Sequence, residues 1–457
     1  MIPKLPLLLS AAALAAAVTL TGQESAPPPV SPAKPPQRVT LFKNVRIFDG
    51  KSPRLSAPSH VLVRGNLIEK ISPDPIPTDR RADTLIIEGG GRTLMPGLID
   101  NHVHVFMGAS TQLEMLRPGA TLESLTAKAA REATAMLMRG FTSCRDLGGP
   151  VFQLKKDIDE GRIAGPRIFP SGAMISQTSG HGDTRQPHER SRRFFGKPSQ
   201  GEEMGINFIA DGRDEVLTAT RENLRFGASQ IKLMAGGGAA TTYDPLDVTQ
   251  YTLDEMKAAV DAADDWGTYV TVHAYTPKAV HRAVEAGVKC IEHGQLLDEE
   301  TIQMLGEKGI WLSLQVLDEA PESAPPDVRA KKHLVVEGTG NAYRWAKLHG
   351  VKLAWGTDFL FNAAQNKNQN PDILKLQQWF TPPEILKMVT SGNAELLALS
   401  GPRNPYPGKL GTAGEGALAD LILTEGDPLT SLDLIADPEK NFTVIMKDGA
   451  IFKNTLK

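Results

Sequence analysis

Two histidines separated by one residue are the sharpest chemical feature of the sequence. His102 and His104 end an apolar run at residues 98–104, and in a β-strand residues two apart point to the same side. Neutral imidazoles placed together in this way can chelate one metal ion. Taken alone the pair is weak evidence, because two solvated histidines in a loop would give the same pattern.

Further predicted strands end in residues of the same kind. His273 ends the strand at residues 269–273, His293 ends the strand at 289–293, and Asp358 follows the strand at 352–356. A buried histidine is ordinarily a satisfied core residue, but three strands ending in histidine by chance is improbable. We therefore interpret the set as metal ligands that converge on one rim.

Lys232, in the predicted strand at residues 230–234, points to the same rim. An ammonium among cations would be repelled, whereas an amine of depressed pKa can take up carbon dioxide and become an anionic carbamate (N6-carboxylysine) that bridges two metals. Paired metals about 3.5–4 Å apart suit a bridging hydroxide nucleophile. The alternative is a lysine paired with Asp358 or with a substrate carboxylate, which would leave a single-metal site.

The elements that position these residues alternate between strands and amphipathic helices. Helices are expected at residues 122–139, 254–266, 277–286, 299–308 and 340–349, between strands at 98–104, 142–146, 167–171, 230–234, 269–273, 289–293, 311–314 and 352–356. This α/β rhythm predicts a (β/α)8 TIM barrel over residues 96–401, with its chemistry at the C-terminal ends of the strands. A doubly wound sheet is the rival, but the glycines at 236–238 lack the GxGxxG spacing. A long insertion at residues 177–215 is expected to form a loop over the active site.

Both ends of the chain consist of short runs in which apolar and polar residues alternate, as half-buried strands require. They lie at residues 41–48, 60–64, 67–71, 85–87 and 93–94, and again at 419–424, 442–447 and 450–453. We therefore expect a small sheet domain built from residues 39–95 and 402–457.

Composition excludes several classes of protein. The 457 residues carry a net charge of −3 and are 41% hydrophobic, which excludes wholesale disorder and gives no electrostatic reason to expect a nucleic-acid partner. The two cysteines, Cys144 and Cys290, cannot build a disulfide scaffold or a Cys-rich zinc cluster. They fall on different predicted strands and are expected to be buried thiols.

The first residues do not belong to the predicted fold. Lys4 precedes an apolar run at residues 5–20, which is typical of a signal peptide at residues 1–22, with an uncleaved anchor as the alternative. Gln23 stands where a lipoprotein would need its acylated cysteine, and residues 23–38 form a proline-rich linker. We expect an exported, periplasmic or secreted protein without a membrane span after signal cleavage.

The ligand set resembles that of the amidohydrolase superfamily, specifically its binuclear branch with a carboxylated lysine. Residues 93–100, 140–146, 391–394 and 416–422 are similar to landmarks of the same superfamily. The resemblance implies a barrel with a small β-sandwich domain formed from both termini. It also implies two divalent metal ions: His102, His104 and Asp358 would bind the first, His273 and His293 the second, and Lys232 would bridge them.

A narrower similarity concerns residues 171–183 and 272–277, which resemble the prolidase-like (Xaa-Pro) dipeptidases and carboxypeptidases, a group that includes ochratoxin hydrolases. These enzymes cut the amide bond before a C-terminal residue with a free carboxylate. The resemblance implies that His181 and Tyr275 contact the carbonyl oxygen or the carboxylate of the substrate. The loop at residues 192–207 matches no member of the group, which leaves the choice of substrate open.

The expected activity is therefore metal-dependent hydrolysis of a small-molecule amide or dipeptide. Asp358 would accept the proton of the nucleophile and pass it to the leaving nitrogen, and zinc is the default metal for these ligands. Alternatives are a single-metal deaminase or imidazolonepropionase-like enzyme, which would not use the lysine, and a non-catalytic barrel, which would typically lack the ligands. Deaminases usually carry a glutamate where Thr276 stands. A homo-oligomer is expected, although no pattern identifies its interface.

Overall fold

The computed structural model describes residues 38–78, 84–117, 119–241 and 243–456. The predicted signal peptide lies outside the described residues, as does the proline-rich linker apart from Arg38, so both stay predictions. Within the described ranges, no helix combines the length and the apolar character that a membrane span needs.

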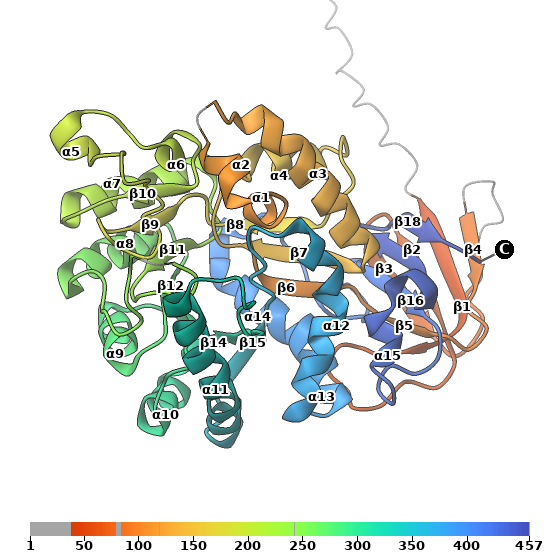
Figure 1. Cartoon of the computed structure of the whole chain (residues 1–457). Coiled ribbons are helices and arrows are strands. Elements are labelled where there is room, and N and C mark those ends of the chain that lie inside the picture. Colours follow the sequence, from red (N-terminus) through yellow and green to blue (C-terminus); the bar gives the residue numbers. More distant parts are fainter. Residues whose placement is uncertain (1–37, 79–83, 118, 242, 457) are drawn as a thin grey trace, which may run out of the picture. The chain divides into compact units, whose positions relative to one another are not determined.

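The two ends of the described chain share one sheet of eight strands. Its order is β18-β17-β16-β5-β1-β2-β3, and β4 pairs with β1. Figure 1 shows these first and last strands gathered together, because β5 from the N-terminal part pairs antiparallel with β16 from the C-terminal part. The strands are β1 (Val39–Ile47), β2 (Ser59–Arg64), β3 (Leu67–Ser72), β4 (Thr84–Glu88), β5 (Thr93–Pro96), β16 (Leu421–Thr424), β17 (Phe442–Lys447) and β18 (Ala450–Asn454).

Strand β1 belongs to both halves of this sheet. Its first residues pair with β2 and β4, its register shifts between Phe42 and Val45, and Arg46 and Ile47 then pair with β5. The two halves enclose one buried apolar cluster that includes Phe42 and Leu421. The small β-sandwich that the sequence predicts from both termini is confirmed.

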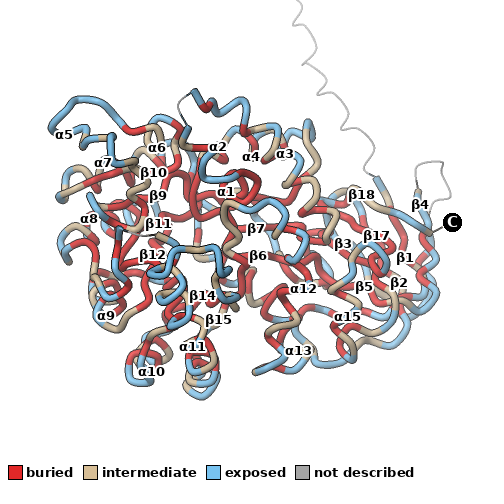
Figure 2. The backbone as a smooth tube through the Cα atoms, in the orientation of Figure 1, coloured by how far each residue is buried: buried red, intermediate tan, exposed pale blue. Residues whose placement is uncertain are grey.

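The predicted TIM barrel is also confirmed, with every strand at its expected place. Its parallel strands are β6 (Leu98–Val103), β7 (Phe141–Asp146), β8 (Arg167–Pro170), β11 (Ile231–Met234), β12 (Val270–Ala274), β13 (Cys290–His293), β14 (Trp311–Leu314) and β15 (Lys352–Trp355). The ring closes where Ser229 N donates to Pro170 O at 2.8 Å and Asp358 N donates to His102 O at 2.8 Å. Figure 2 shows the strands buried inside a ring of helices with exposed outer faces.

Helices follow the barrel strands and cover them. The longer ones are α3 (Leu122–Met138), α4 (Phe152–Asp159), α7 (Arg213–Phe226), α8 (Leu253–Asp265), α9 (Pro277–Ala286), α10 (Glu299–Lys308) and α11 (Pro326–Leu348). Shorter ones lie in the connections: α1 (Val105–Gly108), α2 (Gln112–Leu116), α12 (Gln369–Leu374), α13 (Pro382–Lys387), α14 (Asn393–Leu397), α15 (Asp433–Ala436) and α16 (Pro438–Asn441). Cys144 and Cys290 are buried free thiols, as expected.

Two sequence expectations are wrong in detail. Helix α11 begins at Pro326 rather than at residue 340, because proline suits the first turn of a helix and Gly338 serves close packing, where a Cβ would lie 2.1 Å from Gln295 O. The insertion at residues 177–215 is not wholly a loop. It contains α5 (Arg192–Phe195), α6 (Gln200–Glu203) and β10 (Asn207–Ile209), and β10 pairs parallel with β9 (Met174–Ser176).

Candidate active site

Side chains from the first and last barrel strands meet at the C-terminal rim of the barrel. His102 lies in β6, His104 directly follows β6, and Asp358 follows β15. The Nε2 atoms of both histidines lie 3.3 Å from Oδ1 of Asp358, and one donor atom from each of the three residues lies within 4.8 Å of the others. Two imidazoles and a carboxylate at such distances are arranged as ligands of one cation.

The local backbone brings Asp358 to the two histidines. Position 356 requires a glycine, because a Cβ there would lie 2.4 Å from the backbone nitrogen of His102. Asp100 accepts hydrogen bonds from the backbone N–H groups of His102 and Thr357, each at 3.1 Å, and from the Thr357 hydroxyl at 2.8 Å. Asp358 itself adopts a φ of 52°, a strained backbone conformation of the kind found at functional sites.

His273 and His293 form a second group of donors beside the first. Their ring centroids are 4.4 Å apart, and Nε2 of His293 lies 4.0 Å from Oδ2 of Asp358. Nε2 of His273 lies 3.0 Å from the Gly237 carbonyl oxygen, which leaves its Nδ1 free to bind a ligand. Among the described residues, the buried Nδ1 of His293 meets no hydrogen-bond partner. This pair therefore offers two further nitrogen atoms on the same rim.

Lys232 lies in β11 on the same side of the barrel interior and is only 1% exposed. Burial lowers the pKa of its amine, because the charged form loses its water. Within the part of the chain that the structure describes, this amine makes no hydrogen bond or ion pair. A buried lysine without a partner is a poor structural element and a good candidate for chemistry.

The ring nitrogens favour the neutral form that metal binding needs. Burial lowers the pKa of His102 to about 4, and it lowers the pKa values of His273 and His293 well below their ordinary range. Neutral imidazoles next to an anionic carboxylate are the donor set of zinc and related divalent cations. Nδ1 of His293, which is buried without a hydrogen-bond partner among the described residues, is available to bind such a cation. The residues present therefore fit the metal pair that the sequence implies.

His181, predicted from the sequence as a substrate contact, lies against the second group of donors. Its ring stacks on the His273 ring with centroids 4.0 Å apart, and its Nδ1 lies 2.9 Å from Oδ2 of Asp244. Gly238 makes room for it, since a Cβ there would lie 1.9 Å from the His181 ring. Gly238, the last glycine of the run at residues 236–238 that lacks the dinucleotide spacing, thus serves to admit this imidazole.

Tyr275, the other predicted substrate contact, lies on the same wall of the rim. Its ring meets the His273 ring edge-on at 5.1 Å and stacks on the His293 ring at 5.1 Å. Burial raises the pKa of its hydroxyl group, so that the group stays protonated and can donate a hydrogen bond. The structure therefore brings all the predicted site residues together around one rim.

Several polar residues at the site carried no motif in the sequence. Asp244 orients His181, and Oε2 of Glu292 lies 2.9 Å from Nδ1 of His102. Burial alone would raise the pKa of Glu292, but the Arg145 guanidinium at 2.7 Å holds it well below its usual range. The only sequence signal for Glu292 was its place beside His293 at a strand end, and nothing in the sequence paired it with Arg145.

Lys332, in the second turn of α11, is a half-buried cation at the mouth of the barrel. Burial lowers the pKa of its amine, and of the charges that act on it, the Asp358 carboxylate is the strongest. Its neighbour Lys331 donates to the backbone oxygens of Thr241 and Asp244, and Val335, one turn on, packs in a cluster with Tyr275. This part of α11 therefore lines the entrance to the site.

A (β/α)8 barrel whose C-terminal rim gathers imidazoles, a lysine and a carboxylate has the architecture of a barrel hydrolase. The chain belongs to the amidohydrolase family, whose model matches residues 93–452. It is accordingly a hydrolase that acts on C–N amide bonds, as the sequence predicted.

Named relatives lie in the part of the family that the sequence indicated. The chain is 34% identical over 377 residues to an ochratoxinase of Aspergillus niger, which covers 79% of this chain and 75% of the ochratoxinase. The crystal structure of a prolidase complexed with N-methylphosphonate-L-proline superimposes with a TM-score of 0.83 at 32% identity and covers 91% of this chain and all of its own. The crystal structure of A. niger ochratoxinase gives a TM-score of 0.79 at 28% identity, covering 92% and 96% of the two chains.

Proposed function

We propose that the protein is a metal-dependent hydrolase that cleaves the amide bond before a C-terminal residue in a dipeptide or N-acyl amino acid. The observation that carries the proposal is the convergence of five metal-type donors and an unpartnered buried lysine on one rim. The similarity to a prolidase and to an ochratoxinase supports the position of the cleaved bond, and ochratoxin-type amides belong to the same class.

The chain offers each cation a defined set of ligands. His102, His104 and Asp358 would hold the first, His273 and His293 would hold the second, and Lys232 would bridge them as a carbamate after taking up carbon dioxide. The lowered pKa of Lys232 supports this step, because only the neutral amine reacts with carbon dioxide. Two bound cations, with zinc as the default, would polarise the scissile carbonyl and lower the pKa of a water molecule between them.

The remaining steps belong to side chains of the protein. The Asp358 carboxylate accepts the proton of the attacking water and returns it to the leaving nitrogen, acting as a base and then as an acid. His181 and Tyr275, whose rings lie against those of His273 and His293, contact the scissile carbonyl oxygen, and the Tyr275 hydroxyl donates a hydrogen bond to the developing oxyanion. Lys332 supplies the positive charge that a terminal carboxylate of the substrate needs at the mouth of the barrel.

Metal counting and a substrate panel test the proposal together. Zinc-loaded protein should contain two ions per chain and should hydrolyse members of a panel of Xaa-Pro, Xaa-Arg and Xaa-hydrophobic dipeptides and N-acyl amino acids. One ion per chain with deamination or cyclic-amide hydrolysis would favour the single-metal alternative. Two ions without cleavage of any panel member would contradict the proposed substrate class.

The role of Lys332 is tested by comparing each substrate with its C-terminal carboxamide. Lys332→Met should raise KM for the substrate with a free carboxylate by about 10–100-fold, because it removes one hydrogen bond to a charged group. KM for the carboxamide should stay unchanged. Lys347→Met is the matched control, because Lys347 lies near the other end of α11 and pairs with Glu384. An equal loss for both substrates would contradict carboxylate binding by Lys332.

A further inference from the structure

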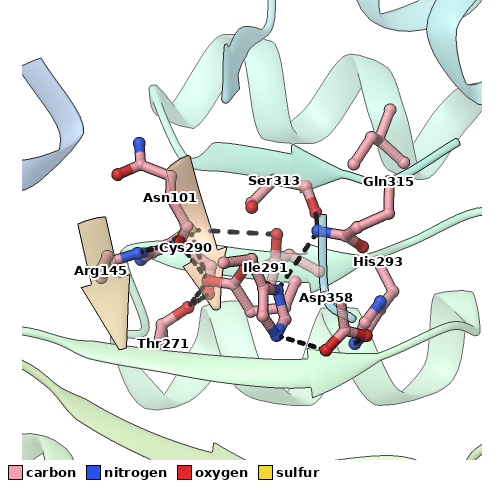
Figure 3. Close-up of polar contacts among 12 residues, drawn as sticks. Asn101, Arg145, Thr271, Cys290, Ile291, His293, Ser313, Gln315 and Asp358 are labelled. Atoms are coloured by element: carbon pink, nitrogen blue, oxygen red, sulfur yellow. Dashed lines mark hydrogen bonds and ion pairs between the residues drawn. The ribbon is translucent and has the colours of Figure 1, made fainter. Parts of the chain in front are cut away.

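A chain of charged side chains runs through the barrel interior to the His102 ring. Nη2 of Arg145 in β7 donates to Oε1 of Glu292 in β13 at 2.7 Å, and Oε2 of Glu292 lies 2.9 Å from Nδ1 of His102. Figure 3 shows Arg145 at one end of this network and Asp358 at the other. Arg145 and Glu292 have no exposed surface. A buried ion pair of this kind contributes little net stability compared with an apolar pair of similar size, so its role must lie elsewhere.

Arg145 is tied to the strand that carries His102. Its Nε donates to the backbone oxygen of Asn101 at 2.7 Å, and its Nη1 donates to the Tyr269 hydroxyl at 3.2 Å. Because Asn101 directly precedes His102, the guanidinium holds Glu292 at a set position relative to the imidazole. The planar fork of an arginine suits this task, since its donors keep a fixed geometry.

The two oxygens of Glu292 have different surroundings. Oε1 accepts from Arg145, from the Thr271 hydroxyl at 2.5 Å and from the Cys290 thiol at 3.3 Å. Oε2, by contrast, has no hydrogen-bond partner among the described residues, and Nδ1 of His102 lies at ion-pair distance from it, 2.9 Å away. The network therefore saturates one oxygen and reserves the other for the imidazole.

We propose that Glu292, held by Arg145, is a positioning residue of the first metal site. Oε2 accepts the proton on Nδ1 of His102, so that the lone pair on Nε2 faces Asp358 and the cation. This inference rests on the proposed metal-dependent function. A carboxylate in this place sets both the tautomer and the orientation of a ligating imidazole and raises its basicity, as second partners of metal-bound histidines do. Arg145 neutralises the buried carboxylate, which keeps the pair tolerable in the core.

Gln315 offers the competing arrangement. Its Nε2 lies 3.2 Å from the same Nδ1 of His102 and also donates to Ser313 O at 3.1 Å. If the amide donated to Nδ1, the ring proton would lie on Nε2 and would block metal binding. A charged acceptor forms roughly twice as strong a hydrogen bond as a neutral partner, so the Glu292 carboxylate prevails over the Gln315 amide.

Zinc affinity, measured by competition with a chromophoric chelator, tests the inference without relying on turnover. Glu292→Gln keeps the shape of the side chain but removes its charge, and it should weaken zinc binding to one of the two sites by about 10–100-fold. The absorption spectrum of the cobalt-loaded variant should change as well, because one ligand is no longer oriented. Thr271→Val is the matched control: of the contacts of Glu292 it removes only a donor to Oε1, and it should bind zinc as the unchanged protein does.

Since Glu292→Gln leaves Arg145 buried without its counter-ion, the double variant Arg145→Met/Glu292→Gln is measured beside it. The double variant removes both charges and should fold, with the same weakened zinc binding. Unchanged zinc affinity in both variants, or an equal loss in Thr271→Val, would overturn the positioning role and leave the proposed function standing. An unchanged protein that binds no zinc would overturn both.

Discussion

The side chains at the rim differ from ordinary core residues in what surrounds their polar atoms. Among the described residues, Nδ1 of His293 and Oδ1 of Asp358 are buried without a hydrogen-bond partner. Each such group costs about 1–3 kcal/mol compared with a satisfied one. A fold that keeps several of them at one place sacrifices stability there, which is typical of sites arranged for binding and catalysis.

Asp358 should be the residue whose charge matters most to turnover. Asp358→Asn keeps the size of the side chain but cannot accept a proton, so we expect kcat to fall by about 10²–10⁴-fold with the far-ultraviolet circular dichroism unchanged. Steady-state kinetics with the best substrate of the dipeptide and N-acyl amino acid panel measures this fall in kcat. Asp318→Asn removes an exposed carboxylate that pairs with Lys375 and should have no effect. An Asp358→Asn enzyme with unchanged kcat would contradict the proton-transfer role.

Gly238 gives a test of the His181 ring that leaves His181 itself in place. In Gly238→Ala the new methyl group would lie 1.9 Å from two atoms of that ring, and the ring must move. Because a displacement of about 1 Å can cost about 10²-fold in rate, we expect a loss of that order in kcat. Gly236→Ala is the control, since its nearest new contact is an ordinary 3.4 Å. Equal activity of the two variants would exclude a catalytic contact by His181.

Between the secondary-structure elements, Arg167 joins the barrel to the sheet domain through ion pairs with Asp420 and Asp448. Arg167 in β8 donates to both carboxylate oxygens of Asp420, at 2.8 and 3.2 Å, and Asp420 precedes β16. Asp420 also accepts from the backbone N–H of Asp448 at 2.7 Å. Asp420 belongs to the motif at residues 416–422 by which the sequence resembles the family, and its task is to hold two domains together rather than to perform chemistry.

Removing Arg167 should therefore destabilise the protein strongly. Arg167→Met leaves the Asp420 carboxylate, which is 3% exposed, without its cation, and breaking a buried pair in this way costs about 3–5 kcal/mol. The midpoint of urea unfolding measures the loss. Lys43→Met breaks an exposed pair with Glu88 and should cost less than about 1 kcal/mol. A similar shift in the two variants would contradict a stabilising role of the buried pair between Arg167 and Asp420.

Asp448, at the turn between β17 and β18, also pairs with Arg167, and the stability that this pair contributes depends on pH. Partial burial alone would raise its pKa, but Arg167 at 2.6 Å lowers the pKa below its ordinary value. A carboxyl group with a lower pKa in the folded state stabilises the fold above its unfolded pKa of about 3.9 and loses this contribution as the pH falls through the folded value.

Asp448→Asn should therefore lower the urea midpoint at pH 7 and approach the unchanged protein as the pH falls below about 3.9. Asparagine tolerates the positive φ of 53° at this position, so the substitution tests charge rather than backbone strain. Urea midpoints measured between pH 3 and pH 7 follow the difference. A difference that stays constant over this range would show that the charge of Asp448 plays no part.

For the molecule as a whole, the fold was predictable because its signals are local. The barrel strands are short and mostly apolar runs, and a histidine or aspartate at the end of several of them, as at His273, His293 and Asp358, marks the rim to which they point. The start of α11 was missed because Gly338 and Gly340 lower helix propensity, while the reason for Gly338 is a contact with the distant Gln295. Local propensity cannot register such a contact.

The partners of the rim residues were missed for the same reason. Arg145 and Glu292 are 147 positions apart, and His181 and Asp244 are 63 positions apart, so no spacing in the sequence joins them. A sequence identifies the residue types that can bind a metal, whereas the groups that orient those residues become visible only when the barrel has closed.

Removal of the metal tests how much the thermal stability of the barrel depends on metal binding at its rim. A cation that binds only the folded protein stabilises it by about 4 kcal/mol at 1,000 times its Kd, so chelation should lower Tm by at least about 4 °C and abolish hydrolysis, and added zinc should restore both. Differential scanning calorimetry with and without a chelator measures the shift. His102→Ala, which removes one ligand, should show a smaller response to zinc. Identical Tm values with and without chelator would mean that no cation is held by the folded barrel, and the hydrolytic mechanism would then have to rest on the side chains alone.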